Sequence, residues 1–545
     1  MANRIDKEII SVQSYIDKHF NKFLSRAFFA AKDGEHWPTY AEAKEEIYSL
    51  AKGLMAKGYT GKHIAVMSEN CYEFLKLFYA SMLAGVVTVP VNLATEPPKI
   101  AEMLHFADVS ALFATNKTNP LADGIKGFLP LVSDVVLLDS TEGENTLEAI
   151  TELGRREEEK EYFGSFDDDR TAMICFTSGT TGGKPKGVML TAKNLLAAAK
   201  YQTHTYKAYV NGDTEESVIH TPLPFFHLAG IICTVTSEAI PTGSTIATCK
   251  SPMECFEDFR RVDPGYTIIV PALAEAMYGM VMSTVKAMGD EEAFAEYTRE
   301  CMEGKYTFEE RREKCRKYTA VLGKNLRGMA VCGAMSDVTI IDRFAILGVH
   351  IGCDYGLTEC SPQVTLAEYP VPQPLGSVGV ACDFNELKIE GGVLYVKGDN
   401  VMKGYYKNPE ATSEALSEDG WLCTGDLAAQ DENGFIYIKG RATSVVVLSN
   451  GDNIDTDELT LQFCSSPAIS EMIILADKKN NNDTLGALIY APEGTSYDDV
   501  KAEVTRINAT LPIQKRIIRF RMMDKPFEKN PMMKIKRFMY LKEEI

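Results

Sequence analysis

Short apolar runs rich in β-branched residues alternate with helical stretches through the first two-thirds of the chain, and this alternation constrains the fold more than any other feature. Five such runs are predicted to be strands: His63–Met67, Val86–Val91, Ala172–Phe176, Tyr266–Val270 and Met329–Cys332. Strands separated by helices form parallel sheets whose two faces are covered by those helices. The pattern therefore predicts an α/β architecture for this part of the chain.

The last third of the chain has a different pattern. After Pro370, short alternating segments such as Glu386–Ile389 and Val393–Lys397 are separated by glycine turns, which predicts a small β subdomain. A final unit has its own predicted strands and a basic end. A chain of 545 residues exceeds what one hydrophobic core usually organises. We therefore expect two domains, residues 1–441 and residues 442–545.

The chain is acidic, with 76 Asp and Glu residues, 57 Lys and Arg residues and a formal net charge of −19. A protein that binds duplex nucleic acid needs the opposite sign, so nucleic acid is not expected as a partner. The segment from Leu511 to Ile545 departs from this balance, because it holds ten Lys and Arg residues and four Asp and Glu residues, a local net of +6. The basic end of the chain therefore needs a functional explanation.

The thirteen cysteines are scattered, without any C-x-x-C pair. The pairs Cys249 with Cys255 and Cys353 with Cys360 have the wrong spacing for a zinc knuckle. Scattered free thiols are typical of buried apolar positions in a reducing compartment. The N-terminus lacks the long apolar core of a signal peptide. We therefore expect a cytoplasmic protein.

The longest uncharged run, Leu77–Thr95, is nominally long enough to cross a bilayer. It contains Gly85 and Pro90, and its pattern changes midway from helical to the β-branched run Val86–Val89. We expect a helix followed by a buried strand, and no transmembrane segment.

The most informative segment directly follows the predicted strand at Ala172–Phe176. It reads Thr177-Ser178-Gly179-Thr180-Thr181-Gly182-Gly183-Lys184-Pro185-Lys186-Gly187. Glycines let backbone N–H groups surround an anion, hydroxyls donate further hydrogen bonds, and lysines neutralise charge. A polyphosphate needs this combination. The segment is not a Walker loop, because Lys184 is followed by Pro185 where that loop has Ser or Thr.

This segment resembles the phosphate loop of the adenylate-forming superfamily, which includes acyl-CoA synthetases, adenylation domains and luciferases. The resemblance implies that Lys186 is catalytic. It also implies that the loop contacts the nucleotide through Thr177, Ser178, Gly179, Thr180, Thr181 and Gly182. The chain departs from the family's pattern by one extra residue at Gly183–Lys184 and by Ala192, where many members have a histidine.

Further motifs follow in the order that the family has them. Leu223–Gly230 resembles the segment whose aromatic or histidine side chain borders the substrate carboxylate, which assigns His227 to the catalytic site. Cys332–Ser336 is similar to the loop beside the adenine, where small residues such as Gly333 and Ala334 let the backbone approach a flat base.

The segment Asp354–Glu359 resembles the family's Y-G-x-T-E motif, so Asp354, Tyr355 and Gly356 are expected to bind the nucleotide. Tyr355 offers a stacking face for adenine and Thr358 a hydroxyl for phosphate. Glu359 offers a hard oxygen ligand for Mg²⁺.

Three matching positions follow in the last third of the chain. Asp426 matches the family residue credited with accepting hydrogen bonds from both ribose hydroxyls, and Arg441 matches an arginine that contacts the nucleotide. Gly451 matches the close-approach residue of the loop that lines the pantetheine tunnel. Thr443 and Ser444 depart from the family's pattern at its hinge.

The basic end of the chain carries the last motif. Pro526–Arg537 resembles the segment with the family's adenylation lysine, which assigns that role to Lys534. The assignment also explains the local net charge of +6, because this arm has to approach a triphosphate.

The resemblance extends from Thr39 to Arg537, and it implies both fold and function. The implied α/β fold is a large N-terminal domain of two α/β subdomains plus a small β subdomain, followed by a small mobile α+β C-terminal domain. The implied reaction is adenylation of a carboxylate by ATP with Mg²⁺, followed by transfer of the acyl group to CoA. The charged insertion before Leu326 and the ending Met532–Arg537 look most like fatty acyl-CoA synthetases, which implies a medium- or long-chain fatty acid as substrate.

Two alternatives remain open. The same first step could deliver the acyl group to the phosphopantetheine of an acyl carrier protein. The departures at Ala192, Thr443 and Ser444 are the support for a nucleotide-binding regulator without catalysis. Release of AMP in the presence of a fatty acid separates that regulator from an enzyme, and reaction with CoA alone separates the two acceptors.

Overall fold

The fold is described from a computed structural model of the chain. The described residues are 6–31, 36–177, 186–200, 217–249, 254–332, 339–367, 373–441, 445–447, 453–477, 484–529, 535, 537–540, 543 and 545. The chain forms two compact units. Unit 1 comprises Met1–Thr177, Lys186–Glu386 and Lys397–Gly420, and unit 2 comprises Ser178–Pro185, Leu387–Val396 and Trp421–Ile545. The domain boundary at residues 441 and 442 stays a prediction.

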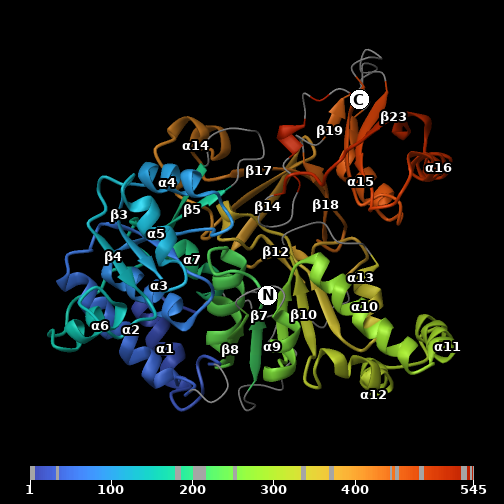
Figure 1. The fold of residues 1–545 in the computed structure, drawn as a ribbon. Helices are drawn as coiled ribbons and strands as arrows, with labels where there is room; N and C mark the ends of the chain where they lie inside the picture. The colour runs from blue at the N-terminus through green and yellow to red at the C-terminus, as the bar shows by residue number, and fades with distance from the viewer. Residues whose placement is uncertain are drawn as a thin grey trace. The chain divides into compact units, whose positions relative to one another are not determined.

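The first sheet of unit 1 has seven strands in the order β16-β6-β5-β2-β1-β3-β4. Figure 1 labels β3, β4 and β5 of this sheet. Strands β1 to β5 are parallel to one another, whereas β6 and β16 are antiparallel additions at one edge. The strands are β1 (His63–Met67), β2 (Val87–Pro90), β3 (Val109–Ala114), β4 (Asp134–Leu137), β5 (Thr171–Thr177), β6 (Lys186–Thr191) and β16 (Gly404–Tyr405).

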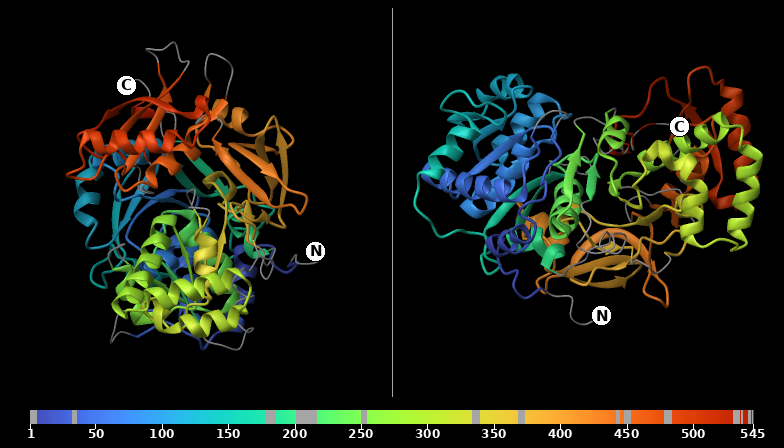
Figure 2. Two further views of the ribbon diagram at one scale, coloured as in Figure 1. Left: turned by 90° about the vertical axis from the view of Figure 1, so that its right-hand side faces the viewer. Right: turned by 90° about the horizontal axis from the view of Figure 1, so that it is seen from below.

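Helices cover this sheet, as the blue to cyan segments of Figures 1 and 2 show. They are α1 (Val12–Lys22), α2 (Tyr40–Ala56), α3 (Tyr72–Ala84), α4 (Pro97–Phe106), α5 (Asn119–Lys126), α6 (Leu147–Arg155) and α7 (Ala192–Lys200). Gly85 ends α3 with a left-handed φ of 66° that L side chains rarely adopt, and the chain turns there into β2. The prediction of a helix and a buried strand over Leu77–Thr95 is therefore confirmed. In the described part of the chain no helix is both long and apolar enough to cross a membrane.

The second sheet of unit 1 has five parallel strands in the order β11-β10-β9-β7-β8. Its strands are β7 (Val218–Thr221), β8 (Thr245–Thr248), β9 (Tyr266–Ile269), β10 (Gly328–Val331) and β11 (His350–Cys353). The segments between them are the π-helix η3 (Ala229–Ala239), α8 (Ile240–Thr242), α9 (Cys255–Val262), α10 (Pro271–Ala287), α11 (Glu291–Met302), α12 (Phe308–Thr319), η4 (Ala320–Leu322) and α13 (Ile340–Ile346).

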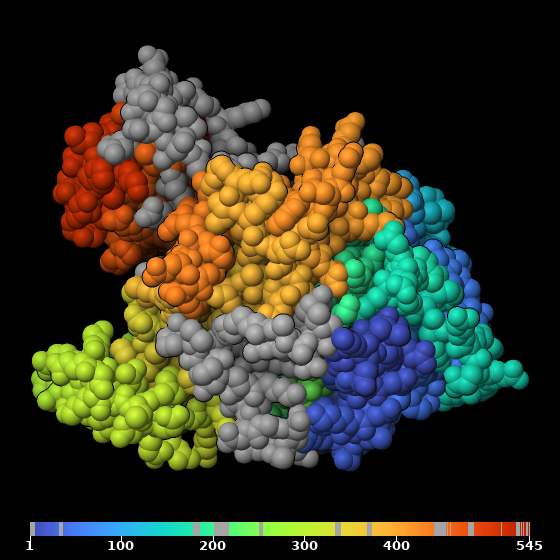
Figure 3. Space-filling view, turned by 180° about the vertical axis from the view of Figure 1, so that it is seen from behind, coloured from blue at the N-terminus to red at the C-terminus, as the bar shows by residue number. Residues whose placement is uncertain are grey.

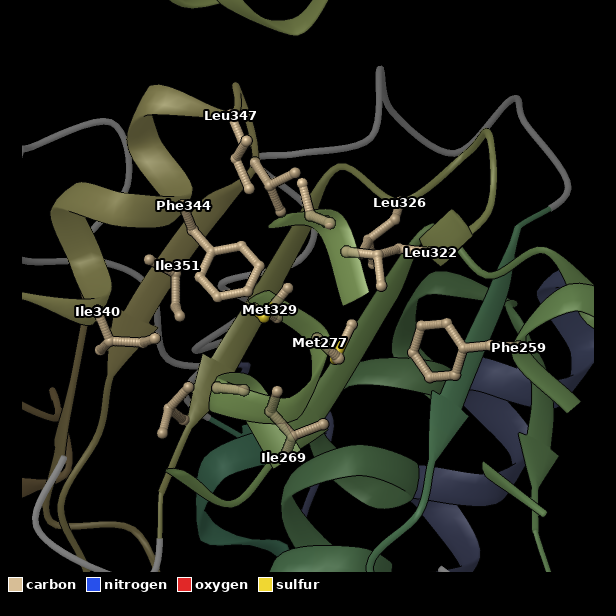
Figure 4. Close-up of a cluster of buried hydrophobic side chains, with 14 of the residues drawn as sticks. Phe259, Ile269, Met277, Leu322, Leu326, Met329, Ile340, Phe344, Leu347 and Ile351 are labelled. Carbon is tan, nitrogen blue, oxygen red and sulfur yellow. The ribbon is translucent and has the colours of Figure 1, made fainter. Parts of the chain in front are cut away.

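The core of the second sheet is built from its strands and the helices on one face. Phe259, Met277, Met329 and Phe344 come from four different elements and point toward one another (Figure 4). The charge-dense stretch at Met282–Lys317 forms helices with mainly exposed side chains, as predicted, and it makes a lobe at the edge of unit 1 (Figure 3).

Buried tyrosines connect the helices of the first sheet to η3 and to the chain just after α8. The Tyr15 hydroxyl donates to the Thr236 carbonyl oxygen at 2.7 Å, and the Tyr79 hydroxyl is hydrogen-bonded to Thr236 Oγ1 at 2.8 Å. The Tyr40 hydroxyl donates to the Ser244 carbonyl oxygen at 2.8 Å. Buried polar groups that are paired in this way fix one packing arrangement.

The remaining elements follow the second sheet in the chain. A short ribbon of β12 (Thr365–Leu366) and β13 (Val380–Ala381) is followed by a sheet in the order β14-β15-β17-β18. That sheet consists of β14 (Asn385–Glu390), β15 (Val393–Gly398), β17 (Leu422–Gln430) and β18 (Ile436–Arg441), with α14 (Pro409–Ala415) between β16 and β17. It confirms the predicted β subdomain.

The C-terminal part of unit 2 has its own α+β core. Phe463, Ile474, Ile489 and Val504 are buried together in it. Its elements are β19 (Val445–Val447), β20 (Asn453–Asp455), α15 (Thr456–Cys464), β21 (Glu471–Ala476), β22 (Leu485–Tyr490), α16 (Tyr497–Asn508), η8 (Ile513–Lys515), β23 (Ile517–Met522) and η9 (Arg537–Met539).

Candidate active site

Two residues of the predicted phosphate loop lie at the open end of a hairpin. Thr177 at the end of β5 is the cross-strand partner of Lys186 at the start of β6. The pairing brings together the two ends of the glycine-rich segment, as a loop that surrounds one anion requires. Five other predicted loop residues lie outside the described residues: Ser178, Gly179, Thr180, Thr181 and Gly182.

Lys186 lies over the ring of Tyr405. Strand β16 is antiparallel to β6, and this pairing makes Tyr405 the cross-strand partner of Val188. The Lys186 Nζ atom lies 4.7 Å from the centroid of the Tyr405 ring. A cation over an aromatic face gains about 0.5–1 kcal/mol at an exposed site. The contact therefore favours one position of the ammonium group beside the loop.

Glu359 is held by the same short strand. It lies in the 3₁₀ turn η5 (Thr358–Cys360), and its carbonyl oxygen accepts a hydrogen bond from Met402 N at 2.8 Å. Its carboxylate Oε1 accepts a hydrogen bond from the Tyr405 hydroxyl at 2.9 Å. Tyr405 therefore contacts two predicted site residues, Lys186 through its ring and Glu359 through its hydroxyl.

Tyr405 was not predicted from the sequence to have a role at the site. Its position depends on the pairing of β16 with β6, two segments that lie far apart in the chain. Local periodicity carries no signal for such a pairing. Only the aromatic pair Tyr405–Tyr406 beside Gly404 marks the segment as unusual.

The donor set at Glu359 suits a hard divalent cation. Mg²⁺ takes oxygen ligands, usually one or two carboxylates together with phosphate and water oxygens. The hydrogen bond from Tyr405 orients the carboxylate through Oε1, and Oε2 is the second oxygen that Glu359 can offer to a metal ion. These residues therefore fit the Mg²⁺ that the sequence predicts.

The rest of the predicted Y-G-x-T-E motif is fixed by backbone hydrogen bonds. The Tyr355 carbonyl oxygen accepts from Val364 N and Thr365 N, each at 3.0 Å. At Gly356 an added Cβ atom would lie 1.6 Å from the Pro362 carbonyl oxygen, so only glycine fits this close approach. Thr358 begins the turn that carries Glu359. The motif is therefore a rigid support for Tyr355, Thr358 and Glu359.

Asp354 directly follows β11, and its Oδ1 atom accepts a hydrogen bond from Ala367 N at 2.8 Å. Burial of the carboxyl group raises the pKa of Asp354 to about 7, and the hydrogen bond from Ala367 only partly opposes this. The raised pKa means that the folded chain holds a proton here that the unfolded chain releases at about pH 4.

We expect Asp354→Asn to weaken the pH dependence of stability between pH 5 and pH 8.5. With a raised folded pKa, stability is highest below about pH 4 and is lost as the pH rises through about 7, by at most about 4 kcal/mol. The loss is smaller than this limit because Asp354 is partly exposed. Thermal unfolding midpoints across this pH range should fall less steeply in Asp354→Asn than in Asp342→Asn, which removes an exposed carboxylate of α13. Equal slopes in the two variants would contradict the prediction.

His227 lies between β7 and η3. Its backbone N–H donates to the Pro224 carbonyl oxygen at 3.0 Å, and its Nδ1 accepts from Ala229 N at 3.2 Å. A neutral imidazole that accepts at Nδ1 carries its proton on Nε2, so the ring can donate a hydrogen bond to a carboxylate.

Asn70 fixes the segment before His227, although no motif in the sequence predicts this role. Its Nδ2 donates to the Leu223 carbonyl oxygen at 2.9 Å and to Thr248 Oγ1 at 2.7 Å. Its Oδ1 accepts from Phe225 N at 2.7 Å. One buried amide on the chain between β1 and α3 thus joins the first sheet to the second.

Asp426 and Arg441 are cross-strand partners in β17 and β18 of unit 2. Asp426 is buried, and its N–H donates to Thr424 Oγ1 at 3.0 Å. The structure therefore brings together the residues predicted to contact the ribose and the nucleotide.

The other predicted positions divide into two groups. Ala192 is buried at the start of α7. The remaining residues lie outside the described part of the chain: Gly333, Ala334, Thr443, Ser444, Gly451 and Lys534.

A large α/β unit with two sheets and a smaller unit with an α+β core are the architecture of adenylate-forming enzymes. The model of the AMP-binding enzyme family matches residues 16–406, so the chain belongs to this family. The predicted superfamily is thereby confirmed.

Individual relatives agree with this assignment. The chain is 28% identical over 546 residues to the long-chain-fatty-acid–CoA ligase FadD15 of Mycobacterium bovis, covering 92% of this chain and 89% of the relative. It is 25% identical to the long-chain-fatty-acid–[acyl-carrier-protein] ligase AEE15 of Arabidopsis thaliana, with 83% and 72% covered. In fold it resembles the O-succinylbenzoate CoA synthetase of Bacillus subtilis in complex with AMP, with a TM-score of 0.73 at 20% identity, covering 96% of this chain and 97% of that one.

Proposed function

We propose that the protein is an AMP-forming acid–thiol ligase that joins a medium- or long-chain fatty acid to CoA. The observation that carries the proposal is the arrangement in which Tyr405 contacts both Lys186 and Glu359. This arrangement supports the proposal, because Lys186 is a cation and Glu359 offers a carboxylate that would bind Mg²⁺. Chemistry on a polyphosphate requires both, because its transition state is stabilised mainly by charge and position.

In the first step, a carboxylate oxygen of the acid attacks the α-phosphorus of ATP. The bond from that phosphorus to the bridging oxygen of the β-phosphate breaks, and pyrophosphate leaves with the bonding electrons. Lys186 and the loop hold the departing phosphates, Asp426 holds the ribose, and Lys534 bridges the carboxylate and the α-phosphate. Mg²⁺ held by Glu359 supplies neutralisation of phosphate charge.

In the second step, the CoA thiol attacks the carbonyl carbon of the acyl-adenylate, releasing AMP and a thioester. His227 donates a hydrogen bond from Nε2 to the substrate carboxyl group and so orients it for both steps. If the C-terminal domain moves between the steps, Lys534 leaves and Gly451 lines the path of the thiol.

Fatty acids are the proposed substrate class because the sequence resembles fatty acyl-CoA synthetases and because FadD15 and AEE15 are both named for long-chain fatty acids. The name of AEE15 also supports a second candidate acceptor, the phosphopantetheine of an acyl carrier protein. The two candidates share the first step and differ only in the thiol.

We expect pyrophosphate release with octanoate and palmitate to exceed release with acetate and benzoate at least tenfold. The release of pyrophosphate and AMP is measured in the presence of ATP and Mg²⁺ under three conditions. These are addition of CoA, addition of acyl carrier protein, and no added thiol. Lys186→Met keeps the length and apolar stem of the side chain without its charge, so it is the matched inactive control. Product ADP, or no turnover with any acid, would contradict the proposal. A thioester with carrier protein but not with CoA would favour the second acceptor.

A further inference from the structure

A buried histidine lies in the second sheet, on the strand that leads toward His227. His220 is fully buried in β7, and within the described part of the chain neither of its ring nitrogens has a hydrogen-bond partner. The ring lies edge-on to Phe259, with centroids 4.6 Å apart. A buried polar group that stays unpaired costs free energy, so a ring with two unpaired nitrogens calls for a ligand.

Two thiols lie next to this ring. Cys249 follows the end of β8, and Cys255 is the first residue of α9. Both are buried. One ligand atom from each of His220, Cys249 and Cys255 lies within 4.8 Å of the other two.

The topology explains why no motif in the sequence indicates this cluster. Strands β7 and β8 are parallel neighbours, and His220 is the cross-strand partner of Ala247. Residues shortly after β8 therefore come close to the end of β7. The spacing of Cys249 and Cys255 alone does not match a zinc knuckle, because the third ligand comes from the neighbouring strand.

We propose that His220, Cys249 and Cys255 form a binding site for a zinc ion. Imidazole nitrogen and thiolate sulfur are the ligands that Zn²⁺ prefers in proteins. Zinc bonds of about 2.0–2.3 Å in tetrahedral geometry place ligand atoms about 3.5–3.8 Å apart, so modest side-chain rotation closes the observed cluster. Three protein ligands leave one coordination position for a small molecule such as water.

Charge favours a divalent ion over a monovalent one. On binding, each of the two thiols releases a proton, and the two thiolates balance the two charges of the ion. A neutral complex with a neutral imidazole is the form that an apolar core tolerates best. Cys249 and Cys255 lie in the core that contains Phe259. The charges of Arg261, which acts on His220, and Asp258, which acts on Cys249, are paired with each other at 3.1 Å, so this ion pair is neutral overall.

The bound ion would tie together β7, the end of β8 and the start of α9. It would act as a structural crosslink, separate from the proposed chemistry at Lys186 and Glu359. The inference does not depend on the proposed function, and each can fail without the other.

The test uses the full chain, purified under reducing conditions and freed of metal with a chelator. Co²⁺ is the spectroscopic probe, because thiolate ligands give it an intense charge-transfer band in the near ultraviolet. We expect one equivalent of Co²⁺ to produce that band and one equivalent of Zn²⁺ to displace it. Bound zinc should raise the thermal unfolding midpoint by roughly 2–3 °C at a hundredfold excess over Kd.

Two variants and one control decide the assignment. Cys255→Ser should weaken metal binding roughly a hundredfold or more and remove most of the band. His220→Leu should lose binding equally, yet leave the metal-free protein at least as stable, because an unpaired polar ring is replaced by an apolar side chain. Cys315→Ser is the matched control, since this buried thiol of the same core donates to the Ile346 carbonyl oxygen at 3.7 Å and lies outside the cluster.

Three outcomes would overturn the proposal. The first is the absence of the cobalt band in the parent protein. The second is equal retention of metal in all three variants. The third is a Cys249–Cys255 disulfide that forms in air while the reduced protein takes up no metal, which mass spectrometry after thiol alkylation detects.

Discussion

Lys534→Ala is expected to reduce formation of the acyl-adenylate roughly 10²–10³-fold, while thioester formation from supplied acyl-adenylate continues nearly unchanged. The magnitude is typical for loss of one charged group that stabilises developing charge in a transition state. The asymmetry follows from the proposed domain motion, because the lysine is needed only while the bond to the α-phosphorus forms. The measurement is a pair of assays, pyrophosphate release from ATP and fatty acid, and AMP release from acyl-adenylate and CoA.

The complementary variant is Gly451→Leu, which should give the opposite result. A side chain at a close-approach glycine would block the path of the thiol and spare pyrophosphate release. Lys525→Ala removes an exposed lysine from the same basic arm and controls for general loss of positive charge. Equal loss of both half-reactions in a folded Lys534→Ala protein would contradict domain alternation, because the lysine would then be needed throughout the reaction.

The sequence predicted the fold well where one local pattern determines one element. The apolar run at Ala172–Phe176 predicts a strand buried on both faces, and it forms β5. The predicted break at Ala84–Gly85 ends α3, because Gly85 has a left-handed conformation. The π-helix η3 was not predicted. Hydroxyl groups in η3 donate hydrogen bonds to the carbonyl oxygen five residues earlier, as Thr234 Oγ1 does to Ala229 at 3.1 Å. A simple apolar periodicity in the sequence does not predict a π-helix.

The same distinction between local and long-range patterns holds for the candidate site. Residues predicted to contact ATP or to hold its Mg²⁺, such as Lys186, Asp426 and Glu359, stand in contiguous motifs with distinctive chemistry. Residues that position those side chains do not stand in contiguous motifs. Tyr405 and Asn70 come from segments distant in the sequence, and a Tyr or an Asn is compatible with many other roles. The cluster at His220 shows the same limit, because a comparison of cysteine spacings within one segment cannot include a ligand from a neighbouring strand.

A substitution of Tyr405 tests the proposed magnesium site directly. Tyr405→Phe keeps the aromatic face under Lys186 and removes only the hydroxyl that donates to Glu359 Oε1 at 2.9 Å. Loss of an outer-shell hydrogen bond typically costs 10–100-fold in metal affinity, so the Mg²⁺ concentration for half-maximal adenylation should rise by about that factor. Glu359→Gln removes the charged oxygen ligand itself and should cost more than Tyr405→Phe.

The matched control is Tyr406→Phe, one residue further along the chain. Its hydroxyl donates to Asp108 Oδ2 at 2.7 Å and makes no bond to Glu359. Both Tyr→Phe variants lose one hydrogen bond of similar length, so a general loss of packing would affect them alike. A magnesium requirement that shifts in Tyr405→Phe and Glu359→Gln but not in Tyr406→Phe identifies Glu359 as the ligand and Tyr405 as the residue that positions it. If Mg²⁺ dependence stays normal in a folded Glu359→Gln protein, the carboxylate is structural and the metal ligand lies elsewhere.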